Sequence, residues 1–192
     1  MGRQIRRSHS DRGSAGVKFS PLWLPGAFLI ETEPASDERG FFARAWCEEE
    51  IAAHGLDTRI AQCSISYNQR RGTLRGMHYQ TAPREEAKVV RCTQGVVYDV
   101  LLDLRPDSPT YCKWAAEELS ARNRRAVYIP PGVAHGFQTL SDEAELFYQI
   151  SQPYDGSLAR GVRWDDSTFD IAWPEPVSSL SDRDRQYPDY RR

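Results

Sequence analysis

The sequence lacks the features that mark secreted, metal-binding or membrane-spanning proteins. Its four cysteines, Cys47, Cys63, Cys92 and Cys112, are scattered along the chain and form no C-x-x-C pair. This spacing argues against a zinc site and against a disulfide-rich secreted scaffold, and it favours reduced thiols in a cytoplasmic protein. No apolar run approaches the ~20 residues that a membrane-spanning helix needs, so we expect no contact with a membrane.

An excess of charge of one sign is also missing. The 25 lysines and arginines nearly balance the 27 aspartates and glutamates, and the formal net charge is −2. Nothing global therefore points to nucleic acid as a partner, and an anionic ligand must be bound by a local cluster of basic residues. The first sixteen residues contain four arginines but lack the apolar core of a signal peptide. We interpret residues 1–17 as a flexible arm, with a nucleic-acid role for those arginines as the minor alternative, and residues 18–192 as one domain.

Strand signals dominate this 192-residue chain, which is long enough to bury a full core. Short apolar or alternating runs are separated by turn residues, and only Trp46–His54 predicts a helix. About ten short strands with turns every 8–12 residues or so are typical of a sandwich or barrel. The composition after Trp173 predicts a tail. The predicted strands are Ala27–Glu31, Phe41–Ala45, Arg59–Ser66, Thr73–Tyr79, Lys88–Thr93, Val96–Leu104, Cys112–Leu119, Ala126–Ile129, Gly136–Leu140, Leu146–Ser151 and Gly161–Trp164.

The four histidines can each be weighed as a catalytic base. His9 lies in the basic arm, and His54 ends the predicted helix, where it suits the helix dipole. His78 and His135 differ, because each lies in a glycine-flanked strand context with basic residues nearby. A hydrogen-bonded interior histidine is the ordinary explanation for one such residue. Two of them shift the balance towards function.

Pro130-x-Gly132-x-x-His135 resembles the second sequence motif of the cupin barrels. In metal-binding cupins the first motif supplies a His-x-His pair and a glutamate, whereas the matching region of this chain offers only His78. A first-row metal needs three or more nitrogen or oxygen ligands in close geometry. We therefore expect an all-β, cupin-type jelly-roll barrel with a few short helices, and neither a metal nor another cofactor.

Several longer motifs make the resemblance more specific. They are Arg39-Gly40-Phe41-Phe42, Gly72-Thr73-Leu74-Arg75-Gly76-Met77-His78-Tyr79-Gln80, Ala87-Lys88-Val89-Val90-Arg91-Cys92, Asp103-Leu104-Arg105, Ser108-Pro109-Thr110, Ala134-His135-Gly136-Phe137 and Leu180-Ser181-Asp182-Arg183-Asp184. In order and spacing they resemble the dTDP-4-dehydrorhamnose 3,5-epimerase family, from about residue 18 to about residue 186. The resemblance implies an isomerase that acts at C3 and/or C5 of a nucleotide-linked (dTDP) 4-keto-6-deoxy sugar.

The family reaction removes a proton next to the C4 ketone and returns it on the opposite face. It needs a base, an acid across the ring, and support for the enolate oxygen. The resemblance implies that His78 is the base and that Asp184 orients it, since a carboxylate on one imidazole nitrogen raises the basicity of the other. It implies that Tyr148 is the acid, because a phenol titrates near ~10 and stays protonated at neutral pH.

The resemblance also implies a set of residues that bind the substrate. Arginine suits phosphate oxygens, because its planar fork donates two parallel hydrogen bonds. The set comprises Arg39, Arg75 and Arg183 for the pyrophosphate, Lys88 and His135 for the sugar and its ketone, Tyr154 for the nucleotide base, and Gln62 and Ser64 elsewhere on the ligand.

Three positions depart from the family pattern. Arg44 and Ala159 stand where the family often has glutamate, and Ser64 stands where it often has asparagine. These residues belong to the binding shell and leave the base, its carboxylate and the acid intact. The prediction is therefore a retained reaction with an open choice of nucleotide and sugar.

Three other functions stay open. A single-centre 3- or 5-epimerase, or a keto-isomerase, would use the same base. A non-catalytic cupin that binds a sugar nucleotide would have no need of a proton relay, and a metal-dependent oxygenase would need a fuller ligand set.

Family members are usually homodimers in which an N-terminal strand crosses to the partner and residues such as Arg39 complete the neighbouring site. The strand Ala27–Glu31 could do so, because an edge strand needs covering.

Overall fold

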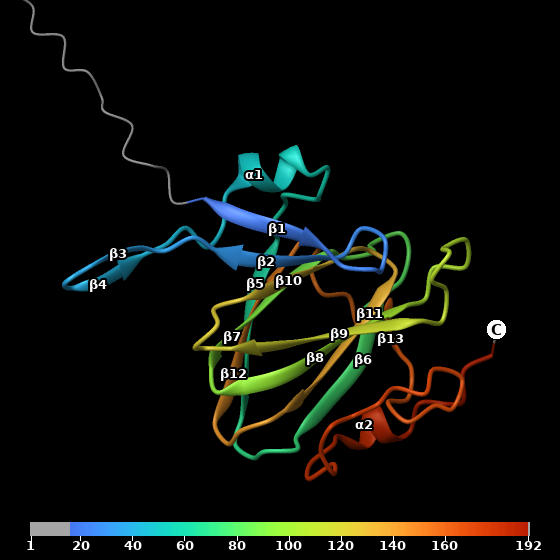
Figure 1. Cartoon of the computed structure of the whole chain (residues 1–192). Helices are drawn as coiled ribbons and strands as arrows, with labels where there is room; N and C mark the ends of the chain where they lie inside the picture. Colours follow the sequence, from blue (N-terminus) through green and yellow to red (C-terminus); the bar gives the residue numbers. More distant parts are fainter. Residues whose placement is uncertain (1–15, 192) are drawn as a thin grey trace, which may run out of the picture.

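The computed structural model describes residues 16–191 and contains two antiparallel sheets that face each other (Figure 1). The six-stranded sheet has the order β1 (Val17–Pro21), β2 (Phe28–Thr32), β10 (Ala126–Ile129), β7 (Lys88–Gln94), β12 (Ala144–Ile150) and β5 (Gln62–Asn68). The five-stranded sheet has the order β13 (Ala159–Gly161), β6 (Leu74–Gln80), β11 (Val133–Thr139), β8 (Val96–Asp103) and β9 (Trp114–Ser120). The prediction of an all-β, cupin-type fold is confirmed.

The main core lies between the two sheets. Side chains alternate along a strand, so every second residue of each inner strand faces the opposite sheet. Val90 and Leu146 of the six-stranded sheet belong to one buried cluster with Leu101 and Phe137 of the five-stranded sheet. Each such side chain contributes about 1.5–3 kcal/mol when it is fully buried. This packed core makes the two sheets a rigid frame for the side chains that lie where the sheets separate.

Two peripheral segments cover the outer faces of the sheets. The short helix α1 (Glu48–Ala53) places Ile51 in a buried cluster with Val89 and Tyr128 of the six-stranded sheet. The C-terminal segment runs along the five-stranded sheet and contains α2 (Asp182–Arg185), as Figure 1 shows. The segment after residue 173, which composition predicts as a tail, is therefore packed against the barrel.

A small hairpin leaves the body of the molecule. It consists of β3 (Ala35–Asp37) and β4 (Gly40–Phe42) and projects away from both sheets (Figure 1). The predicted strand Phe41–Ala45 corresponds to β4, which ends at Phe42 and pairs only with β3. Of the predicted arm, residues 1–15 lie outside the described part of the chain, while Val17 already pairs with Thr32 of β2.

Candidate active site

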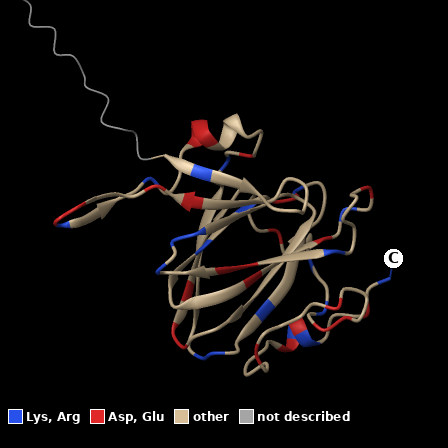
Figure 2. Ribbon diagram, in the orientation of Figure 1, with Lys and Arg blue, Asp and Glu red and all other residues tan. Residues whose placement is uncertain are grey.

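A cavity of about 430 Å³ opens between the two sheets. It is lined from one side by β6 and β11 and from the other by β5, β7 and β12, so it lies where the two layers separate. Figure 2 shows basic and acidic residues interspersed over the whole ribbon, with both signs meeting on α2 beside the five-stranded sheet. The predicted site residues that line the cavity are Gln62, Ser64, Arg75, His78, Lys88, His135, Tyr148, Tyr154 and Arg183.

His78 is held by a carboxylate from the far end of the chain. Its Nε2 lies 2.6 Å from Oδ1 of Asp184, which is buried, and Oδ2 of the same carboxylate accepts a hydrogen bond from the backbone N–H of Gly76. Burial alone would raise the pKa of Asp184, but the hydrogen bonds from His78 and Gly76 bring that pKa below its usual value. An ionised carboxylate only accepts hydrogen bonds, so Nε2 carries the proton and Nδ1 keeps a free lone pair.

Asp184 reaches His78 because of a helix cap. Ser181 is the N-cap of α2, and its hydroxyl oxygen accepts a hydrogen bond from the backbone N–H of Asp184 at 3.1 Å. This serine with an acidic residue three positions later is a known helix-start signal. The cap fixes the first turn of α2, and thereby the direction in which the Asp184 side chain leaves it.

Two glycines allow β6 and β11 to approach closely beside the histidines. His78 and His135 are direct partners in the register of these strands. A Cβ atom on Gly76, whose φ is +123°, would lie 2.5 Å from the Cα of Gly136, and a Cβ on Gly136 would lie 2.6 Å from Sδ of Met77. No other residue fits at either position without displacing the partner strand. The glycine-flanked histidines of the sequence are therefore neighbours in space.

His135 has a carboxylate partner that the sequence did not reveal. Its Nε2 lies 2.8 Å from Oδ2 of Asp99 on β8, and both side chains are buried. Burial raises the pKa of Asp99, and the adjacent His135 opposes that rise. The second oxygen of Asp99 has no hydrogen-bond partner among the described residues. Each of the two histidines that line the cavity is thus paired with a buried carboxylate behind it, His78 with Asp184 and His135 with Asp99.

Tyr148 faces these histidines from the other sheet. It lies on β12, and its ring meets that of His135 edge-on with 5.8 Å between centroids. Desolvation raises the pKa of Tyr148 well above 10, the charge of Asp99 adds to the rise, and Arg75 opposes it. The phenol is therefore neutral over the whole physiological range and retains a proton to donate.

The rim of the cavity carries the basic and aromatic residues. Arg75 donates from Nε to Oδ1 of Asn68 at 2.7 Å, which fixes its guanidinium at the rim. The backbone N–H of Tyr154 donates to Oε1 of Gln62 at 2.9 Å, and this hydrogen bond fixes the two residues relative to each other. Asn68 was not predicted, and only its buried position next to Arg75 shows that it orients the arginine. Arg183 enters from α2.

Two residues of the expected binding shell lie outside the cavity of their own chain. Arg39 is in the turn of the β3–β4 hairpin, its side chain is 84% exposed, and it pairs with Asp37. Arg44 forms an ion pair with Glu50 of α1 at 3.1 Å between Nη1 and Oε1. The other two departures from the family pattern, Ser64 and Ala159, line the cavity.

Residues 16–191 contain neither a cluster of metal ligands nor a membrane-spanning helix. No group of three or more histidine, cysteine, aspartate or glutamate side chains within this range is arranged to hold a metal ion. None of the helices in the same range is both long enough and apolar enough to cross a membrane. The expectation of metal-free chemistry stays a prediction.

A two-sheet barrel with a histidine–carboxylate pair on one wall and a neutral tyrosine on the other is a cupin-like protein equipped for proton transfer. The sequence profile of the family described as dTDP-4-dehydrorhamnose 3,5-epimerase matches residues 21–192. The chain belongs to this family, and the resemblance inferred from its motifs is confirmed.

Individual relatives agree with this assignment. The chain is 41% identical to the dTDP-4-dehydrorhamnose 3,5-epimerase of Shigella flexneri over 162 residues, and this match covers 84% of this chain and 89% of the relative. It is 39% identical over 170 residues to the dTDP-4-dehydrorhamnose 3-epimerase of Streptomyces niveus, with 88% and 82% covered. The crystal structure of the Bacillus anthracis 3,5-epimerase with TDP and PPi bound superposes with a TM-score of 0.88 at 35% identity, and covers 91% of this chain and all of that one.

Proposed function

We propose that this protein is an isomerase that epimerises C3 and/or C5 of a dTDP-linked 4-keto-6-deoxy sugar. The observation that carries the proposal is the His78–Asp184 pair, which faces Tyr148 across a cavity between the sheets. Membership of the epimerase family supports it, as does the nucleotide bound in the Bacillus anthracis relative. A protein that only bound a sugar nucleotide would have no need of an oriented base.

His78 acts as the general base in this proposal. Asp184 holds the proton on Nε2, so the lone pair of Nδ1 is free to remove a proton from the carbon next to the ketone. The buried carboxylate also stabilises the imidazolium that forms. Asp184 is a positioning residue, because it acts on the substrate only through His78.

Tyr148 supplies the proton on the opposite face. Its raised pKa keeps the phenol protonated until the carbanion forms beside it. Lys88 and His135 line the same cavity and stabilise the negative charge that develops on the ketone oxygen. The chemistry therefore divides between the two sheets, with the base on β6 and the acid on β12.

The nucleotide end of the substrate lies at the rim in this proposal. Arg75 and Arg183 bind the pyrophosphate, because a guanidinium matches the geometry of phosphate oxygens. Tyr154, which is exposed beside the cavity, stacks on the base. Gln62 and Ser64 of β5 contact the ligand from the facing sheet. This local basic rim would bind a pyrophosphate although the chain as a whole is slightly acidic.

The reaction is tested by solvent exchange. We expect dTDP-4-keto-6-deoxyglucose, incubated with the protein in deuterium oxide, to incorporate deuterium at C3, at C5 or at both, as read by NMR. A panel of UDP-, GDP- and CDP-linked keto sugars serves as the control for nucleotide choice. Absence of exchange at both carbons with every sugar nucleotide tested would contradict the proposal.

The number of carbons that react separates the main proposal from its neighbour. A single-centre 3-epimerase is a specific candidate, because the Streptomyces niveus relative carries that name at 39% identity, close to the 41% of the 3,5-epimerase relative. The same NMR spectra distinguish the two. Exchange at C3 alone supports a 3-epimerase, and exchange at both C3 and C5 supports a 3,5-epimerase.

We further propose that the protein is a homodimer, and that it works in the cytoplasm with its four cysteines unpaired. The projecting β3–β4 hairpin carries Phe42 with 77% of its surface exposed, and the edge strand β5 carries Ile65 with 65% exposed. Apolar side chains grouped on a hairpin and a sheet edge favour burial against another protein surface. A partner subunit that covers them would receive Arg39 at its own cavity.

Complementation between two variants tests this arrangement. We expect Arg39→Ala and His78→Asn to be weak or inactive alone, and their co-expressed mixture to recover about a quarter of the wild-type activity. Random pairing makes half of the dimers mixed, and each mixed dimer keeps one intact site out of two. Activity of the mixture equal to the average of the two separate variants would show that Arg39 serves its own chain or none.

A further inference from the structure

The cavity contains a third ion pair, between Glu86 and Lys88, and Glu86 has no role in the proposed reaction. Oε1 of Glu86 lies 2.8 Å from Nζ of Lys88, with side-chain exposures of 12% for the glutamate and 9% for the lysine. Both residues line the cavity. A carboxylate that is almost withdrawn from water, inside a pocket that binds an anionic ligand, is costly unless it is paired and used.

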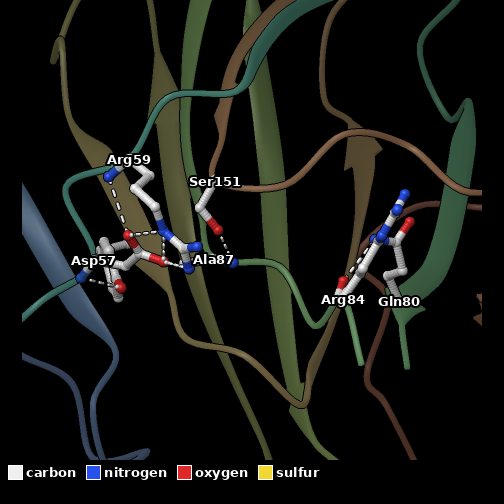
Figure 3. Close-up of polar contacts among 7 residues, drawn as sticks. Asp57, Arg59, Gln80, Arg84, Ala87 and Ser151 are labelled. Atoms are coloured by element: carbon white, nitrogen blue, oxygen red, sulfur yellow. Dashed lines mark hydrogen bonds and ion pairs between the residues drawn. The ribbon is translucent and has the colours of Figure 1, made fainter. Parts of the chain in front are cut away.

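The backbone on both sides of Glu86 is fixed by hydrogen bonds, which Figure 3 shows. Nε2 of Gln80 donates to the carbonyl oxygen of Arg84 at 2.6 Å, and the backbone N–H of Ala87 donates to Oγ of Ser151 at 2.8 Å. Gln80 is itself buried and tied to the backbone N–H of Asp155. These anchors hold the segment that carries Glu86 independently of the lysine.

Lys88, by contrast, has little else to hold it. Its only other hydrogen-bond partner among the described residues is the backbone carbonyl oxygen of His78, at 3.5 Å from Nζ, and the buried carboxylate of Asp99 attracts its charge from beyond ion-pair distance. A lysine has a flexible four-carbon stem, so the position of its ammonium group depends on what it binds. In a poorly solvated pocket the attraction to a carboxylate at contact distance dominates over a weak carbonyl contact. The ion pair with Glu86 is the shortest polar contact of Nζ, and it therefore has the largest part in placing the ammonium group.

We propose that Glu86 is a positioning residue of the reaction: it holds the ammonium group of Lys88 at the place where the ketone oxygen becomes an enolate. This inference rests on the proposed function. Because the enolate oxygen carries charge only after the proton has left, a well-placed ammonium group acts on the transition state more than on substrate binding. Glu86 should accordingly affect kcat far more than KM, since the nucleotide is bound by other residues at the rim.

The experiment compares Glu86→Gln with Glu85→Gln. The two changes are chemically identical and adjacent, but Glu85 is exposed and does not line the cavity. With dTDP-4-keto-6-deoxyglucose as the probe, we expect E86Q to lower kcat by roughly tenfold to a hundredfold, as a small displacement of a catalytic group does. We expect its KM to change little, and we expect E85Q to match the wild type in both kcat and KM.

Two further measurements keep the result interpretable. Glu86→Asp retains the charge and should recover part of kcat, which a role independent of that charge would not predict. Binding of dTDP, followed by calorimetry, shows whether each variant is folded. An E86Q protein that binds dTDP and has wild-type kcat would overturn the inference while wild-type exchange stands. Failure of the wild type to exchange any proton would instead overturn the proposed function.

Discussion

Replacing His78 by asparagine should lower deuterium exchange into the keto sugar by about 10²–10⁴-fold, the usual contribution of a general base. Asparagine is similar in size and can still donate a hydrogen bond to Asp184, but it has no lone pair of comparable basicity. Binding of dTDP should be nearly unchanged, because the nucleotide end is assigned to Arg75, Arg183 and Tyr154 at the rim and not to the His78 side chain. NMR exchange rates and calorimetric binding constants measure the two effects on the same protein.

Two companion variants sharpen that result. Asp184→Asn keeps the shape of the side chain but removes the charge that fixes the tautomer of His78, and a loss approaching 10⁴-fold has a precedent in an aspartate that orients a catalytic histidine. His54→Asn is the matched control, since His54 stacks on Phe19 outside the cavity. Exchange by H78N at a rate close to that of H54N would remove His78 from the role of base.

The catalytic pairing could be predicted from sequence only where a motif marked it. His78 stood out because it is one of four histidines and lies in a glycine-flanked strand. Asp184 would read as a solvated charge near the C-terminus, and only the resemblance to a family connected it with a strand 106 positions earlier. The Ser181 cap was visible as a spacing, but a cap predicts a helix start and not the partner of its carboxylate.

Asp99 and Glu86 escaped sequence reasoning for two different reasons. Asp99 interrupts the apolar run of β8, and a charged residue inside a buried strand needs a partner, so the sequence contains a signal for a buried charge pair at this position. Glu86 follows Glu85 in a polar connection, where two adjacent glutamates ordinarily point into water. Only the fold shows that one of them is turned into the cavity.

Short elements were predicted less well than the central strands. The long apolar runs of β7 and β8 fix their own positions, because one face must be buried whatever the neighbours are. The strand β1 and the β3–β4 hairpin are short and contain no fully buried residue, so no buried face marks them in the sequence. The surfaces on which the proposed dimer depends are therefore those that the sequence specified least.

Replacing Tyr148 by phenylalanine is expected to separate proton exchange from epimerisation. The variant keeps the aromatic ring that packs edge-on against His135 but has no proton to donate. His78 can still remove a proton and return a deuteron on the same face, so exchange should continue at a rate within about tenfold of the wild type, whereas inversion should fall by about 10²–10⁴-fold with the loss of the acid. NMR of the product mixture counts exchanged and inverted centres in one spectrum.

Tyr67→Phe is the matched control for this change. Tyr67 lies on β5 with its side chain exposed outside the cavity, so loss of its hydroxyl group should alter neither rate. Because desolvation already holds the pKa of Tyr148 well above 10, the wild-type inversion rate should show no titration of this phenol between pH 6 and 9 or so. Equal losses of exchange and inversion in Y148F would mean that Tyr148 supports the base, and that the proton on the opposite face comes from another group in the cavity.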